Sequence, residues 1–349
     1  MDKRGGGVLN KIRQVFFCLF LSVGGWGSFA IAASVDERVV ISLPGPRSIS
    51  YLPIELIGKI GADRAEGIHV GLRHFGGGGL AMQDLMKRNS EFAVLGLPAV
   101  MSQYANGGDV AAVAAVNDLP LYMLMVRADL KGQVKKIADL RGRVIGVYSS
   151  SLSSKTASQQ LMELVLKSAG VSLDEVRFIS IGQSWQGIST MFQSGAVDAV
   201  MGGEPFASRL RNEKQVFFLL DLSKPSDASS VPGVGFLRAT LVTRGETVRN
   251  FPQRVEKMVR ALRRSLHWMS THTPEAIVEK LDIQNGEERL SLLNALKSYP
   301  RLYSPDGRFS SAQMRETQHF FRKSSGDNPA AMELDVESLI VDHWAGRKE

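Results

Sequence analysis

The sequence has little of several things that would point to common classes of function. Its single cysteine, Cys18, lies in a short apolar run at 15–23, so the chain downstream offers no disulfide, thiolate metal site or cysteine nucleophile. No other apolar run approaches the roughly 20 residues that a membrane-spanning helix needs. The net charge is only +7 over 349 residues, without a concentrated basic stripe, which argues against nucleic-acid binding.

The N-terminus has the layout of an export signal. Four basic residues precede the apolar run, and the small residues Ala30 and Ala32 follow it. This order is typical of a secretory signal peptide spanning 1–32, cut before Ala33. The alternative, a membrane anchor, requires a longer apolar run. Removing 1–32 takes away four basic residues and one aspartate, which lowers the net charge from +7 to +4. We expect a soluble protein exported to the periplasm.

Beyond the signal, short apolar runs alternate with amphipathic helical patterns. This alternation indicates βαβ units on mainly parallel sheets flanked by helices. The expected strands span 37–43, 68–75, 91–96, 109–116, 121–126, 143–148, 176–182, 197–202 and 236–242. Past residue 252 the pattern is helical. The chain is longer than a single core usually supports, so two lobes are expected.

Two segments of the chain echo one another. The segment 76–98 aligns without gaps with 182–204, placing Gly76 on Gly182 and a proline just after each expected strand. Apolar positions recur at spacings of 3 and 4 in both copies, as in helices that pack on a sheet. The alternative is that any two βα units look alike. If the echo is real, the chain contains two similar α/β lobes.

Four consecutive glycines, 76–79, raise the possibility of a nucleotide site. Gly76-x-Gly78-x-x-Ala81 fits a dinucleotide fingerprint, but the strand that follows ends in Gly96 and Leu97 without the required carboxylate. Leu80 and Ala81 stand where a phosphate loop needs Lys and Ser or Thr. What remains is a helix N-terminus with exposed N–H donors, a generic site for an anion.

Catalytic patterns are missing as well. The segment "GQSWQG" misses the G-x-S-x-G pattern because Gln186 replaces the second glycine. Four of the six histidines form two pairs five residues apart, which do not share a helix face as zinc-binding pairs do, and His319 and His343 lie in the helical tail. We predict no enzymatic activity, no metal and no cofactor. Polar residues do cluster where the expected strands end, which is where ligands bind in α/β sheets; turn or capping roles are the alternative for each cluster.

Three segments carry a resemblance to a known family: "FGGGGLAMQDLMKRNSEFAVLG", "IADLRGRVIGVYSSSLSSKTASQQLMELVLKSAGVSLDEVRFISIG" and "GAVDAVMGGEPFAS". They resemble the periplasmic substrate-binding proteins of nitrate/sulfonate/taurine-type ABC transporters, of the NMT1/THI5-like group, over about 37–270. The resemblance implies a type II periplasmic-binding fold with two α/β lobes, 33–127 with 235–349 and 128–234, joined by crossing strands at 121–126 and 236–242. The ligand is then enclosed between the lobes by hinge closure.

The resemblance also implies a function and a site. The protein would capture a small ligand (a sulfonate, a nitrate-like anion, or an aromatic or pyrimidine-type compound) and deliver it, as a monomer, to an ABC permease and ATPase. Alternatives are a relative of pyrimidine-precursor-synthesising enzymes and a ligand-sensing module that docks on a receptor. Arg47 is the expected anion partner, while Tyr51 and Trp185 suit a flat aromatic ligand. The expected site residues are Arg47, Ser48, Tyr51, Gly77, Gly78, Gly79, Leu97, Pro98, Asn117, Ser153, Ser154, Lys155, Thr156, Gln183, Trp185 and Glu204.

Overall fold

The computed structural model describes residues 37–119, 121–148, 156–326 and 328–349. The expected signal peptide at 1–32 and its cleavage point lie outside these residues. Within the described ranges, no helix is both long and apolar enough to cross a membrane. The described residues belong to one compact unit, Val35–Glu349, built on two five-stranded sheets.

The first sheet combines strands from the start of the chain with one strand from beyond residue 235. Its members are β1 (Glu37–Leu43), β2 (Ile68–His74), β3 (Phe92–Leu95), β4 (Val110–Ala115) and β10 (Thr240–Arg244), in the order β2-β1-β3-β10-β4. β1 runs parallel to β2 and β3, whereas β10 runs antiparallel to β3 and β4, with Thr240 opposite Leu95. The carboxyl ends of β1 and β3 therefore lie at the edge where β10 begins.

The second sheet repeats this arrangement. Its members are β5 (Met123–Arg127), β6 (Val144–Val147), β7 (Arg177–Ser180), β8 (Ala199–Gly202) and β9 (Val216–Asp221), in the order β7-β6-β8-β5-β9. β6 is parallel to β7 and β8, and β5 is antiparallel to β8 and β9. The two orders match strand for strand, and β3 and β8, which end the two echoing segments, occupy the same place. The sequence echo thus agrees with a structural repeat.

The expectation of an α/β fold on two mainly parallel sheets is confirmed, since in each sheet four strands run in one direction and one strand runs against them. The antiparallel members are β5 and β10, where the chain passes from one sheet to the other and enters against the direction of its neighbours. β5 pairs within the second sheet, although the expected boundary at 127 put it in the first lobe. As a division into lobes, the expected boundaries remain a prediction.

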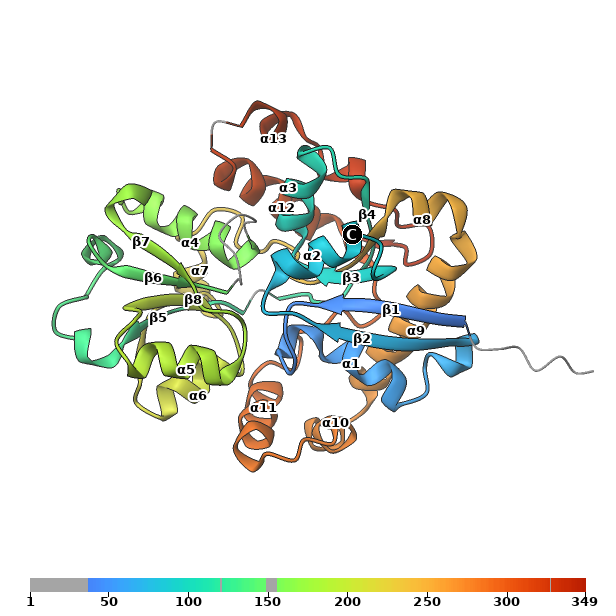
Figure 1. Ribbon diagram of the computed structural model, residues 1–349, viewed down its shortest axis with the longest axis horizontal. Coiled ribbons are helices and arrows are strands. Elements are labelled where there is room, and N and C mark those ends of the chain that lie inside the picture. The colour runs from blue at the N-terminus through green and yellow to red at the C-terminus, as the bar shows by residue number, and fades with distance from the viewer. Residues whose placement is uncertain (1–36, 120, 149–155, 327) are drawn as a thin grey trace, which may run out of the picture. The chain divides into compact units, whose positions relative to one another are not determined.

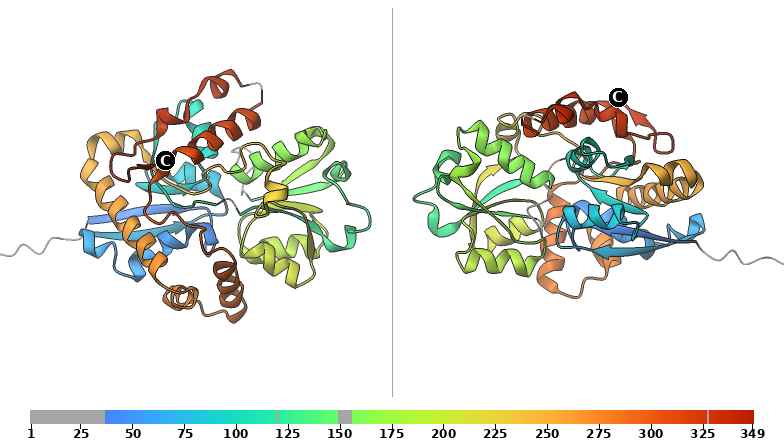
Figure 2. Two further views of the ribbon diagram at one scale, coloured as in Figure 1. Left: turned by 180° about the vertical axis from the view of Figure 1, so that it is seen from behind. Right: turned by 45° about the horizontal axis from the view of Figure 1, so that its top comes forward.

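Helices cover both faces of each sheet. Around the first sheet lie α1 (Leu52–Lys59), α2 (Gly78–Met86), α3 (Leu97–Ala105), α8 (Gly245–Asn250) and α9 (Pro252–Thr271); around the second lie α4 (Ala157–Ser168), α5 (Trp185–Gln193), α6 (Phe206–Asn212) and α7 (Pro225–Ala228) (Figure 1). The remaining elements are α10 (Pro274–Leu281), α11 (Gly286–Ser298), β11 (Phe309–Ser310), α12 (Ser311–Ser324), α13 (Pro329–Glu333) and β12 (Arg347–Lys348). α12 packs against both α3 and α4 (Figure 2).

Separate apolar clusters fill the two faces of the first sheet. On one face, Ile54 of α1 and Met258 of α9 pack against Ile41 of β1. On the other, Leu85 of α2 and Val100 of α3 pack with residues of β3 and β4. The helices form because their apolar residues recur at spacings of 3 and 4, which places them on one face. This packing holds the loops after β1 and β3 in fixed positions.

Candidate functional site

Loops that follow β1, β3, β6 and β7 meet at a small buried cavity of about 40 Å³. In α/β folds, ligands bind outside the carboxyl ends of the strands. The cavity is lined by Pro44, Tyr51, Gly78, Leu95, Gly96, Ala99, Tyr122, Tyr148, Thr156, Ala157, Ser158, Gln183 and Arg238. It therefore receives side chains from the loops of both sheets and from the connections that lead into β5 and β10.

Arg238 is the dominant charge of this cavity. Its residue is only 8% exposed, and its Nη1 donates to the carbonyl oxygen of Leu121. The guanidinium carbon lies 4.1 Å from the ring centroid of Tyr122, a cation–π contact. Among the described residues, no carboxylate forms an ion pair with Arg238. A buried charge without a counterion is costly, so the site favours a species that supplies negative charge.

The backbone around Arg238 is held on both sides. The carbonyl of Leu237 accepts a hydrogen bond of 2.9 Å from the N–H of Leu97, and the carbonyl of Ala239 accepts one of 2.9 Å from Val116. Space for the side chain comes from Gly203. A Cβ there would lie 2.6 Å from the carbonyl oxygen of Leu121 and would also collide with Nη2 of Arg238. The guanidinium is thus placed by the fold rather than by flexible contacts.

Three tyrosines surround the cation. Tyr51, Tyr122 and Tyr148 are each at most 8% exposed, and burial raises the pKa of each hydroxyl above its ordinary value. They are therefore neutral donors at physiological pH. The Tyr51 hydroxyl bonds to the side chain of Gln183. The Tyr148 hydroxyl has no hydrogen-bond partner among the described residues, so it is available to a ligand.

The N-terminus of α4 adds further donors. Thr156 caps this 12-residue helix, its side chain accepting a hydrogen bond from the N–H of Gln159 at 3.3 Å. Thr156, Ala157 and Ser158 all line the cavity. Unpaired N–H groups and the helix dipole make the start of a helix attractive to negative charge. Arg238, the Tyr148 hydroxyl and this helix start together form a cationic, donor-rich environment.

The structure brings four of the expected site residues together in the cavity: Tyr51, Gly78, Thr156 and Gln183. Gly79 lines an adjoining groove. Outside the cavity lining lie Ser48, Gly77, Leu97, Pro98 and Asn117, of which Leu97 takes part through its backbone bond to Leu237. Ser153, Ser154 and Lys155 fall outside the described residues. As ligand contacts, all of these remain predictions.

Arg47, Trp185 and Glu204 have partners within the protein instead. The Arg47 guanidinium lies 3.9 Å from the carboxylate of Glu55 and 3.7 Å from that of Glu288. The Trp185 ring is covered by the guanidinium of Arg209 at 3.7 Å. Glu204 is buried and accepts hydrogen bonds from the backbone and side chain of Ser208, and burial raises its pKa. None of the three lines the cavity.

The sequence-based reasoning missed Arg238, Tyr122 and Tyr148. A signal for Arg238 was present, because it is the one charged residue in the apolar run "FLRATLV" at 236–242. A lone charge in a buried strand usually has a purpose, since burying it is costly. Tyr122 and Tyr148 lie at the ends of apolar runs, where a tyrosine is common and carries no distinctive signal.

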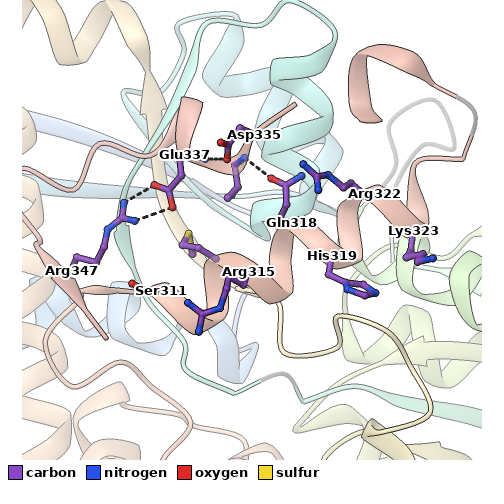
Figure 3. Close-up of a pocket in the computed structure, with 11 residues that line it drawn as sticks. Ser311, Arg315, Gln318, His319, Arg322, Lys323, Asp335, Glu337 and Arg347 are labelled. Atoms are coloured by element: carbon purple, nitrogen blue, oxygen red, sulfur yellow. Dashed lines mark hydrogen bonds and ion pairs between the residues drawn. The ribbon is translucent and has the colours of Figure 1, made fainter. Parts of the chain in front are cut away.

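Larger hollows elsewhere lack a buried charge. One, of about 530 Å³, lies along α12, where Arg315, His319, Arg322 and Lys323 are exposed and Glu337 is paired with Arg347 (Figure 3). Another, of about 610 Å³, lies beside α9, α10 and α11. A third, also of about 530 Å³, is an open hollow beside the end of α5. Exposed cations are well hydrated and bind anions weakly. The buried cavity at Arg238 is therefore the candidate site, and the described residues hold no cluster suited to a metal ion.

Comparison with known proteins gives relatives for this architecture. The sequence model of the NMT1/THI5 like family matches residues 64–276, more than half of the chain. No curated protein sequence matches. The family resemblance inferred from the sequence is confirmed.

Several solved structures are similar over nearly their whole length. A protein from Bordetella bronchiseptica RB50 has 22% identity and a TM-score of 0.80, covering 88% of this chain and 95% of its own. The alkanesulfonate-binding protein SsuA from Xanthomonas axonopodis pv. citri, solved bound to MOPS, has 14% identity and a TM-score of 0.67, covering 88% and 98%. The desulfurization enzyme DSZB has 17% identity and a TM-score of 0.55, covering 88% and 97%. At these identities the likeness shows the fold, that of periplasmic binding proteins.

Proposed function

The chain belongs to the NMT1/THI5-like family, and from that premise we propose that it is an exported solute-binding protein that captures a small anion at Arg238 for an ABC importer. The observation that carries the proposal is the buried guanidinium of Arg238, which has no carboxylate partner among the described residues. A fold that places an uncompensated cation between neutral tyrosines gains stability when an anion binds.

The chemistry of the cavity favours a single negative charge. Arg238 supplies one full positive charge, and its planar guanidinium suits two parallel hydrogen bonds to one oxyanion group. The Tyr148 hydroxyl and the N–H groups at the start of α4 add neutral donors. A sulfonate, a carboxylate or nitrate meets these requirements. The aromatic walls formed by Tyr51, Tyr122 and Tyr148 also tolerate a planar group.

The test is calorimetric titration of the chain from Ala33 with nitrate, alkanesulfonates, alkanecarboxylates and aromatic carboxylates. We expect one-to-one binding that Arg238→Ala weakens by at least about 30-fold, since truncating one partner of a buried charge pair costs roughly 2–5 kcal/mol. Arg238→Lys keeps the charge without the planar fork and is expected to lose part of the affinity. Arg322→Ala, an exposed arginine on α12, is the matched control.

The Arg47→Ala variant tests whether the anion binds at Arg47, as expected from the sequence, or at Arg238. Loss of binding in Arg47→Ala together with full binding in Arg238→Ala would overturn the assignment of the site. Enzymatic turnover is tested in the same samples, because the fold also occurs in a desulfurization enzyme. We expect the bound compound to be recovered unchanged, and a released product would move the proposal to catalysis.

Export, delivery and the monomeric state are parts of the same proposal. Mass spectrometry of the protein from a periplasmic extract is expected to find the chain beginning at Ala33. Delivery predicts that liganded protein stimulates the ATPase of a permease complex encoded beside it. A sensing role on a receptor predicts no such stimulation.

A further inference from the structure

The cavity at Arg238, about 40 Å³, is much smaller than the roughly 300–1,000 Å³ of a usual ligand pocket. The anionic head group of a ligand is expected to lie there, beside Arg238. A groove of about 360 Å³ adjoins it, and Gly78, Leu95 and Ala99 line both spaces. We call this space the tail groove; it runs between α2, α3, α4 and α12. The rest of a ligand whose anionic group is bound at Arg238 is expected to extend into this groove.

The tail groove has a distinct chemistry. Its polar lining consists of hydroxyl and carboxamide side chains: Ser102, Gln103, Asn106, Gln160, Ser324, Ser325 and Asn328. Its apolar lining includes Met82 and Phe321. None of the described residues that line the groove carries a charge. The groove therefore suits a body that forms hydrogen bonds without carrying charge.

Gln160 is positioned to form a hydrogen bond with the part of the ligand that lies in the tail groove. It lies one turn along α4 from Thr156, about 6 Å at 1.5 Å per residue, and Thr156 lines the cavity. Gln160 is only 4% exposed. Its Nε2 donates to Oγ of Ser102 at 2.8 Å, and this hydroxyl donates to the carbonyl oxygen of Pro98 at 3.1 Å. The Oε1 of Gln160 accepts no hydrogen bond from the described residues.

We propose that the tail groove selects anions whose body carries a neutral hydrogen-bond donor, a hydroxyl or an amide N–H, about 6 Å from the anionic group. This proposal rests on the proposed function, anion capture at Arg238. A donor at that distance satisfies Oε1 of Gln160, which is otherwise unpartnered in a buried position. A methyl group there leaves the oxygen unpartnered. An ammonium group finds no carboxylate in the described lining and lies near the Arg238 cation, which repels it.

Three sulfonates that differ only at the terminal group test this. The probes are 3-hydroxypropane-1-sulfonate, butane-1-sulfonate and 3-aminopropane-1-sulfonate, titrated by calorimetry into the chain from Ala33. We expect the hydroxyl compound to bind at least tenfold more tightly than the methyl compound, with the amino compound weakest. The carboxylates 4-hydroxybutanoate, pentanoate and 4-aminobutanoate repeat the series with the other head group.

Variants at Gln160 test whether the tail groove causes the expected order of affinities for the three end groups. Gln160→Leu is expected to abolish the preference for hydroxyl over methyl while leaving the affinity for the methyl compound within about threefold. Gln160→Glu is expected to favour the amino compound, because it adds a carboxylate. Gln193→Leu, an exposed glutamine on α5, is the matched control and is expected to leave the ranking unchanged.

The outcomes separate this proposal from the one it rests on. Equal affinities for the three end groups in the wild-type protein, or a hydroxyl preference that survives in Gln160→Leu, would overturn the tail groove while leaving anion capture intact. Absence of binding in both series would overturn the tail groove, and it would overturn anion capture as well if nitrate and the aromatic carboxylates also fail to bind. If Gln160→Leu does not fold, as judged by circular dichroism, the wild-type ranking and Gln160→Glu decide the matter.

Discussion

The guanidinium of Arg238 lies over the ring of Tyr122, 4.1 Å from its centroid, and both side chains are buried. Tyr122 immediately precedes β5 and Arg238 precedes β10. These are the two places where the chain passes between the sheets. A ligand bound to Arg238 therefore lies beside both connections. A hinge movement between the two sheets would change the backbone at these connections.

Replacing Arg238 by Met is expected to separate stability from binding. The variant removes a buried charge that lacks a carboxylate partner, and such replacements are often neutral or stabilising. We expect the ligand-free Arg238→Met protein to be at least as stable as the wild type and to have lost anion binding. Chemical denaturation measures the first effect and calorimetry the second. A loss of more than about 2 kcal/mol in unfolding free energy would show that the cation–π contact is structural.

Gly203→Ala tests the close packing around the guanidinium. The new Cβ would lie 2.6 Å from the carbonyl oxygen of Leu121 and collide with Nη2 of Arg238. We expect a destabilisation of about 1–3 kcal/mol and weaker anion binding, because the backbone carbonyl has no room to move. Gly132→Ala is the control, since a Cβ there meets nothing within 4 Å. Equal melting temperatures for the two variants would contradict the packing described above.

Glu55 is expected to make stability depend on pH. It is buried beside Arg47, Glu288, Lys59 and His74, and burial raises its pKa from the ordinary 4.5 to about 7. The folded protein then holds more protons than the unfolded chain between pH 4.5 and pH 7, so stability falls as pH rises across that window. The contribution is on the order of 3 kcal/mol.

Glu55→Gln is expected to remove this dependence and to be the more stable protein at pH 8. The Oε1 of the new side chain still accepts the hydrogen bond that the N–H of Arg47 donates to Glu55 at 2.8 Å. Urea unfolding from pH 4.5 to pH 8 measures both proteins. Parallel stability curves for the two would show that the pKa of Glu55 is the same in the folded and unfolded states.

Arg347 is expected to hold the C-terminal end of the chain in place. It donates to both carboxylate oxygens of Glu337, at 2.9 and 2.7 Å (Figure 3). It also donates to Asp342 at 2.8 Å, and these bonds raise the pKa of Arg347. We expect Arg347→Ala to speed amide exchange in 336–348 and to cost about 1 kcal/mol at low salt, less at 1 M. Arg322→Ala on the same face is the control. If amide exchange in 336–348 is unchanged, the C-terminal end of the chain is held by apolar packing and not by the ion pairs of Arg347.

Local features were predictable because their causes are local. A threonine followed by a proline is typical of a helix start, and at the start of α10 the side chain of Thr273, which precedes Pro274, accepts the N–H of Ala276. The strands and helices follow from apolar spacing, and the echo of 76–98 in 182–204 corresponds to the matching places of β3 and β8. The absence of an acidic residue after 96–98 already excluded a dinucleotide fingerprint.

The α/β class, the family and the presence of donors at strand ends could be predicted from the sequence, because these depend on neighbouring residues, whereas the repeat stayed open until the strand orders were known. The arginine that lines the cavity could be recognised from the three-dimensional structure alone. Arg47 follows β1, as an anion-binding residue would, but the carboxylate of Glu288 lies 3.7 Å from its guanidinium. No local sequence pattern predicts an ion-pair partner that is 241 positions away. Arg238 lies in an apolar run, and only the meeting of both sheets' loops makes it the buried charge without a counterion. Ion pairing depends on distances in space, which the order of residues does not reveal.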